Sequence, residues 1–140
     1  PYDPEIYVNW GVALARLNQK NKAEIQFKKA LGLSLTHINA SFLLGVVQYE
    51  QNKIHEALAS FNYTVKLDSK HVMAFYYLSL INTKLQKYKE ALLKIINAYN
   101  LSEDEEKWEK IIKKHYLQTL ETPQLDQFVS LIVKLQRVAD

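Results

Sequence analysis

The stretch of sequence that decides the fold occurs twice, as Lys53-Ile54-His55-Glu56-Ala57-Leu58 and as Lys87-Tyr88-Lys89-Glu90-Ala91-Leu92. The two copies are 34 residues apart, and Ala23 stands a further 34 residues upstream of Ala57. A fixed period of this length, filled with helix-forming residues, is typical of solenoids built from stacked helical hairpins. Such solenoids bind other proteins more often than they catalyse reactions.

Outward from these alanines, three units cover residues 4–37, 38–71 and 72–105 without an insertion. Each unit is predicted to hold two antiparallel helices. We expect the first helices at 4–17, 38–51 and 71–85, and the second helices at 21–34, 54–67 and 88–101. The short loops between them carry Asn18, Asn52 and Gln86, and asparagine tolerates the left-handed backbone that ends a helix.

Small and large residues recur at equivalent positions of the three units, and we call each set of equivalent positions a column. The small columns let the two helices of a hairpin approach closely where they cross, and they hold Gly11, Gly45 and Ser79 with Ala23, Ala57 and Ala91. The large columns supply the apolar side chains around that contact, and they hold Trp10, Leu44 and Leu78 with Phe27, Phe61 and Ile95. Each hairpin leaves one apolar face that the next hairpin must cover.

The composition fits a helical domain and disfavours several classes of function. The 140 residues are 48% hydrophobic, which is enough to build a core. The formal net charge is only +3, and Arg16 and Arg137 are the only arginines, which disfavours nucleic-acid binding. The lack of cysteine excludes disulfides and thiolate chemistry. No apolar run is long enough to span a membrane, and we favour the cytoplasm, although the sequence does not fix the compartment. We interpret the start at Pro1 as that of a fragment or processed product.

The repeating columns resemble those of the tetratricopeptide repeat family over residues 4–105. The resemblance implies an all-α fold, a right-handed superhelix of stacked antiparallel helical hairpins. Two columns depart from the family pattern: the usual proline near the end of a unit is replaced by Leu35, Ser69 and Glu103, and an often aromatic position holds Leu14, Gln48 and Asn82.

Residues 106–139 continue the frame as a degenerate fourth hairpin or a two-helix cap of the same domain. Lys113 and Leu125 occupy columns that are small in the other units. Residues 123–138 are apolar almost all round, so this segment is a candidate for self-association or for contact with further repeats.

The resemblance implies that the first helices of successive hairpins line a concave groove. The apolar side chains that would bind a partner peptide or helix there are Val8, Val12, Phe42, Val46, Tyr49, Met73, Tyr76 and Leu80. A lysine-rich end would favour acidic residues of the partner, and it consists of Lys84, Lys107, Lys110 and Lys114. Alternatively, these residues pack between neighbouring helices, a terminal helix of the chain fills the groove, or the lysines form an ordinary solvated face.

Other sites are weaker candidates. Some members of the family clamp a free carboxylate, but the matching positions here are Val8, Val12, Leu43, Met73 and Tyr77, so such a clamp is not expected. His37 and His71 share one column, yet no third ligand joins them, and we interpret them as turn or surface residues. No phosphate loop or nucleophile elbow is present, so we expect no cofactor, no metal and no enzymatic activity. The sequence therefore predicts a non-catalytic interaction module or scaffold, with a self-assembling structural protein as the alternative.

Overall fold

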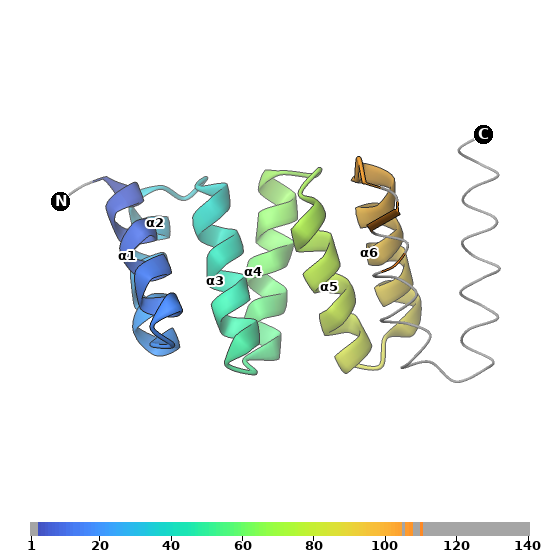
Figure 1. Cartoon of the computed structure of the whole chain (residues 1–140), viewed down its shortest axis with the longest axis horizontal. Helices are drawn as coiled ribbons and strands as arrows, with labels where there is room; N and C mark the ends of the chain where they lie inside the picture. The colour runs from blue at the N-terminus through green and yellow to red at the C-terminus, as the bar shows by residue number, and fades with distance from the viewer. Residues whose placement is uncertain (1–2, 105, 108–109, 111–140) are drawn as a thin grey trace.

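Six α-helices make up the computed structural model, which describes residues 3–104, 106–107 and 110. Their bounds are α1 Pro4–Arg16, α2 Lys20–Leu33, α3 Ile38–Glu50, α4 Ile54–Leu67, α5 Val72–Lys84 and α6 Tyr88–Leu101. All twelve ends lie within one residue of the predicted ones. The helices form three hairpins in a row, with α1 and α2 at the N-terminal end (Figure 1). This arrangement confirms the all-α hairpin solenoid, whereas the predicted fourth hairpin lies almost wholly outside the described residues.

None of the helices in the described part of the chain has the length and hydropathy that a membrane crossing requires.

The loop inside each hairpin contains one residue with a left-handed backbone. These residues are Asn18, Asn52 and Gln86, with φ angles of 59°, 61° and 60°. A left-handed residue ends the first helix and lets the chain reverse within a few residues. The predicted role of the loop asparagines is confirmed, and Gln86 adopts the same conformation although glutamine is less suited to it.

The first helix of each hairpin begins with a side-chain cap. Asp3 Oδ1 accepts a hydrogen bond from the Glu5 backbone N–H at 3.0 Å. His37 Nδ1 accepts one from the Ala40 N–H at 3.0 Å, and His71 Nδ1 accepts one from the Ala74 N–H at 3.1 Å. The two histidines lie at the turns between hairpins as predicted, but their specific role is to satisfy an N–H that the helix leaves unpaired.

The two helices of a hairpin meet where a glycine faces an aromatic ring. A Cβ atom added to Gly11 would lie 2.5 Å from the Phe27 ring, and one added to Gly45 would lie 2.8 Å from the Phe61 ring. Both phenylalanines are fully buried. The small columns therefore serve the predicted close approach, and the space they leave is occupied by the large residue of the partner helix.

Successive hairpins stack through a repeated apolar contact. Leu44 and Val47 of α3 pack in one buried cluster with Ala23 and Phe27 of α2. A larger cluster joins α4, α5 and α6 in the same manner. The prediction that Trp10 packs like its column partners Leu44 and Leu78 is wrong, because 51% of Trp10 is exposed. The physical reason is that the described chain offers no hairpin before α1 to cover it.

A buried carboxylate also connects the first two hairpins through partly exposed partners. The Glu24 carboxylate on α2 accepts hydrogen bonds from Lys53 Nζ at 2.9 Å and from Gln51 Nε2 at 3.0 Å, and Lys28 Nζ lies 3.0 Å from its other oxygen. Burial alone would raise the Glu24 pKa. The hydrogen bonds from Lys53, Lys28 and Gln51 outweigh it and lower the pKa from 4.5 to about 2.

Candidate functional site

The predicted partner-binding residues fall on α1, α3 and α5. Their spacing of three or four residues places them on one face of each helix. They are Val8 and Val12 on α1, then Phe42, Val46 and Tyr49 on α3, then Met73, Tyr76, Leu80 and Lys84 on α5. Lys107 and Lys110 follow α6 and are exposed, and Lys114 lies outside the described residues.

An aromatic cluster connects α3 with α5, and we define it as Phe42, Tyr49, Tyr76 and Tyr77. The ring centroid of Tyr77 lies 5.5 Å from that of Tyr49 and 5.8 Å from those of Phe42 and Tyr76, each time edge to face. Tyr77 also stacks on the buried Phe61 ring, at 4.9 Å and with 11° between the planes. The cluster is therefore anchored to the hydrophobic core through Tyr77.

Tyr77 is the residue that the sequence analysis did not include in the site. It appeared there only as a mismatch to a carboxylate clamp. Tyr76 and Tyr77 are adjacent on one predicted helix, and Phe42 and Tyr49 lie on the corresponding helix of the preceding unit. This concentration of aromatic residues is the signal that could have identified Tyr77.

The structure does not bring all predicted residues together. Val8 and Val12 belong to a separate cluster with Ala30 and Ala40, apart from the aromatic cluster. Val8 and Leu80 are also buried, so neither offers a partner appreciable surface. Phe42, Val46, Tyr49 and Tyr76 are half-buried, and Met73 is 40% exposed. The half-buried aromatic residues thus pack between helices and still present part of their surface.

Positive charge lies next to the aromatic cluster. Lys84 Nζ lies 4.6 Å from the centroid of the Tyr49 ring, within the range of a cation–π contact. Lys107 and Lys110 add exposed charge further along the chain, although Lys110 Nζ lies 3.4 Å from a carboxylate oxygen of Glu106. Burial raises the pKa of Tyr49, Tyr76 and Tyr77, so these phenols stay neutral near pH 7. Neutral phenols keep a proton with which they can donate a hydrogen bond.

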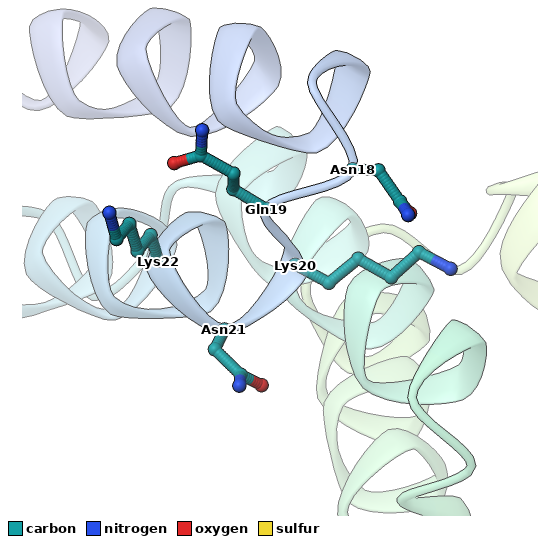
Figure 2. Close-up of a pocket in the computed structure, with 5 residues that line it drawn as sticks. All are labelled: Asn18, Gln19, Lys20, Asn21 and Lys22. Atoms are coloured by element: carbon teal, nitrogen blue, oxygen red, sulfur yellow. The ribbon is translucent and has the colours of Figure 1, made fainter.

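The described residues also contain an open hollow of about 290 Å³ at the loop between α1 and α2. It is lined by the consecutive residues Asn18–Lys22, whose side chains point in different directions (Figure 2). Because these side chains do not converge, the hollow lacks the geometry of a catalytic or cofactor site. Within the described segments, no group of three or more His, Asp or Glu residues is placed to hold a metal ion.

Comparison with known families assigns the chain. A family model described as "Anaphase-promoting complex, cyclosome, subunit 3" matches residues 16–98, which is more than half of the sequence. The chain belongs to this family. Among curated proteins, no sequence match is found for this member of the subunit 3 family.

Solved structures confirm that the fold is that of tetratricopeptide repeat proteins. "MamA 41-end from Desulfovibrio magneticus RS-1" has a TM-score of 0.77 at 23% identity over 99% of this chain and 78% of that one. YrrB, "a TPR protein with an unusual peptide-binding site", has a TM-score of 0.72 at 22% identity over 79% of this chain and 57% of that one. "First TPR of Spaghetti (RPAP3) bound to HSP90 peptide SRMEEVD" has a TM-score of 0.75 at 14% identity over 80% of this chain and 89% of that one. At these identities the similarity describes the fold and not the ligand.

Proposed function

We propose that this protein is a non-catalytic interaction module that binds an extended or helical segment of another protein on the aromatic cluster. The observation that carries the proposal is that Phe42, Tyr49 and Tyr76 are only half-buried, although each packs against Tyr77, which stacks on the buried Phe61 ring. Aromatic side chains that keep exposed surface are common anchors of protein interfaces. Val46 and Met73 extend the same surface with aliphatic side chains. Val12, which is half-buried, is the residue of the predicted site that lies on α1.

The chemistry of the surface favours a partner with a large apolar side chain next to acidic residues. Lys84 lies over Tyr49. Lys107, Lys110 and Lys114, which follow later in the sequence, would add further positive charge. Two relatives in fold support peptide binding in general, because one is named for a peptide-binding site and another was solved with an HSP90 peptide. The carboxylate-clamp positions do not match, so the proposal is for binding through apolar anchors and not through a terminal carboxylate.

Selection from a random peptide library displayed on phage, with the whole chain as bait, tests this function. We expect selected peptides to combine large apolar residues with Asp or Glu. Met73→Glu should weaken their affinity at least about tenfold, because it places a charge of the wrong sign on the apolar surface. Leu93→Glu is the matched control, since Leu93 is equally exposed but lies on α6. Affinity should also fall with added salt if the lysines take part.

Peptides that bind both variants as tightly as the native chain would overturn the assignment of the site to α3 and α5. Self-association through residues 123–138 is the alternative function from the sequence, and that segment lies outside the described residues. Light scattering at several concentrations tests it, because a concentration-independent monomer would remove it.

A further inference from the structure

The three loops inside the hairpins lie along one edge of the row, and the turns between hairpins lie along the opposite edge (Figure 1). We call the first of these the loop edge and define it as each loop with the adjoining helix ends, which are residues 16–22, 50–56 and 84–90. These stretches hold seven Lys or Arg residues against three Glu residues, which leaves a net charge of +4. The whole chain has a net charge of only +3. The loop edge therefore carries a larger positive excess than the chain as a whole.

The opposite edge is acidic. In the part of it that the structure describes, five carboxylates face only two lysines, over residues 3–5, 33–39, 66–72 and 101–104. Charges separated in this way give the molecule one side that attracts an acidic partner and one side that repels it. The polarity therefore assigns an acidic partner to the loop edge.

Most cations of the loop edge are not neutralised by the protein itself. Lys20 Nζ lies 3.8 Å from a carboxylate oxygen of Glu50, and Lys53 is bound to the buried Glu24. The other five are exposed, and none of them takes part in an ion pair within the described residues; they are Arg16, Lys22, Lys84, Lys87 and Lys89.

The helix dipoles account for only part of this arrangement. Arg16 and Lys84 lie in the last turns of α1 and α5, where positive charge is favourable. Lys22 and Lys89 lie in the first turns of α2 and α6, and Lys87 lies just before α6. Positive charge is unfavourable there, because the N-terminus of a helix is the positive end of its dipole. Carboxylates of a partner would relieve this repulsion.

We propose that the loop edge binds a run of acidic residues of a partner protein. An extended run of about six residues is about 20 Å long, which matches three hairpins stacked about 10 Å apart. Nucleic acid fits less well, because phosphates and bases are usually bound by arginine and by stacked aromatic rings. The loop edge has one arginine, Arg16, and one aromatic residue, the half-buried Tyr88.

The loop edge adjoins the aromatic cluster through Lys84, whose ammonium lies over the Tyr49 ring. One partner could therefore place an apolar anchor on the aromatic cluster and continue with acidic residues along the loop edge. Binding to the loop edge does not require the aromatic cluster, so the two proposals can be tested separately.

The probe is a fluorescein-labelled peptide of ten glutamates, and its binding to the whole chain is measured by anisotropy at about 0.1 M salt. We expect Lys22→Glu/Lys89→Glu to weaken binding at least about tenfold, because two attractive charges become repulsive. This variant should fold, since glutamate is favourable in the first turn of a helix.

Lys66→Glu/Lys70→Glu is the matched control, because it changes the net charge by the same amount. These two exposed lysines lie at and after the other end of α4, about 20 Å away. The screening length is only about 10 Å at 0.1 M salt, so binding should weaken less than about twofold. Met73→Glu, which tests the aromatic surface, should leave binding of this probe unchanged.

Three results would overturn the proposal. One is a native chain that does not bind the glutamate peptide. Another is an equal loss of binding in the two double variants, which would show an effect of net charge and not of the loop edge. The third is tighter binding of an oligonucleotide of ten thymidines, or of phosphatidylserine vesicles, that is lost only in Lys22→Glu/Lys89→Glu. That result would assign the loop edge to a phosphate-bearing partner.

Discussion

At the scale of single residues, each hairpin is fixed by one matched pair at its helix crossing. In the first two hairpins a glycine on the first helix accommodates a phenylalanine on the second, as Gly45 does for Phe61. In the third hairpin the same columns hold Ser79 and Ile95, and both are fully buried. A larger residue on one helix is thus matched by a smaller one on the other, which is expected where the packing is close to its limit.

This matching predicts the outcome of exchanging the pair in the second hairpin. Gly45→Ser should lower the free energy of unfolding by about 1–3 kcal/mol, because the new side chain meets the fully buried Phe61 ring. Phe61→Ile should cost about 1–2 kcal/mol through the cavity it leaves. The double variant recreates the pair of the third hairpin, and it should recover about 1 kcal/mol of the summed loss.

Urea unfolding followed by circular dichroism measures all three variants and the native chain. Gly45→Ser alone also gains helix propensity, which works against the predicted loss, so the coupling energy is the decisive quantity. Strictly additive losses would show that the two residues do not share one space and that the pairing of Ser79 with Ile95 is coincidental.

At the scale of helices, the histidine cap makes the start of α5 sensitive to protonation. His71 Nδ1 can accept the Ala74 N–H only when that nitrogen carries no proton. Its ring lies 4.6 Å from the Phe42 ring, centroid to centroid, and is half-buried there. Burial lowers the His71 pKa below 6.5, and the nearby Asp68 opposes this shift only in part.

The lowered pKa predicts a loss of stability in mild acid. Between the folded pKa and 6.5 the unfolded chain binds more protons than the folded chain, so the stability is fully present above 6.5 and falls as the pH drops below it. We expect a loss of about 1 kcal/mol, the typical value of a helix cap. His71→Asn keeps an oxygen acceptor without a titrating group and should flatten this part of the profile. Urea unfolding at pH values from neutral to mildly acidic measures the effect.

His55→Asn serves as the control for that experiment, because His55 is exposed on α4 and caps no first helix. If this variant flattens the pH profile as much as His71→Asn does, the cap is not the origin of the dependence.

The helices were more predictable than the interactions at their ends. The period of alanines and glycines predicts each boundary of the six described helices to within one residue, because the crossing of the helices depends on the columns of small residues. The caps by His37 and His71 could not be read from the sequence, since a histidine caps rarely and its role depends on the side-chain rotamer. The exposure of Trp10 could not be predicted either. The repeat pattern shows that a helix face is apolar, but it does not show whether a neighbouring helix covers that face.

The candidate site was predictable in part for the same reason. The resemblance to the tetratricopeptide repeat family assigned Phe42, Tyr49 and Tyr76 to one surface, and the structure brings them together through Tyr77. Helical spacing alone did not distinguish the buried Val8 and Leu80 from the accessible Met73, because their burial depends on contacts between helices. Whether this surface binds a partner remains a prediction.

At the scale of the whole molecule, the described core is unevenly distributed along the row of hairpins. The largest buried cluster joins α4, α5 and α6, and side chains of α3 pack against it. The first hairpin takes part in two smaller clusters and leaves one apolar face in solvent. In a solenoid each unit is stabilised only by itself and its neighbours, so an end with fewer buried contacts should open independently.

Native-state amide hydrogen exchange should therefore show that α1 and α2 open more easily than α5. Val8→Ala removes buried volume in the first hairpin, and it should accelerate exchange in α1 and α2 while leaving α5 protected. Leu78→Ala removes a fully buried side chain from the largest cluster, and it should lower the protection of all helices, because opening the middle of the row exposes both sides. Equal protection of α1 and α5 in the native chain, with both variants raising exchange everywhere, would mean that the three hairpins unfold as one cooperative unit. The uncovered face of α1 would then cost the molecule no local stability.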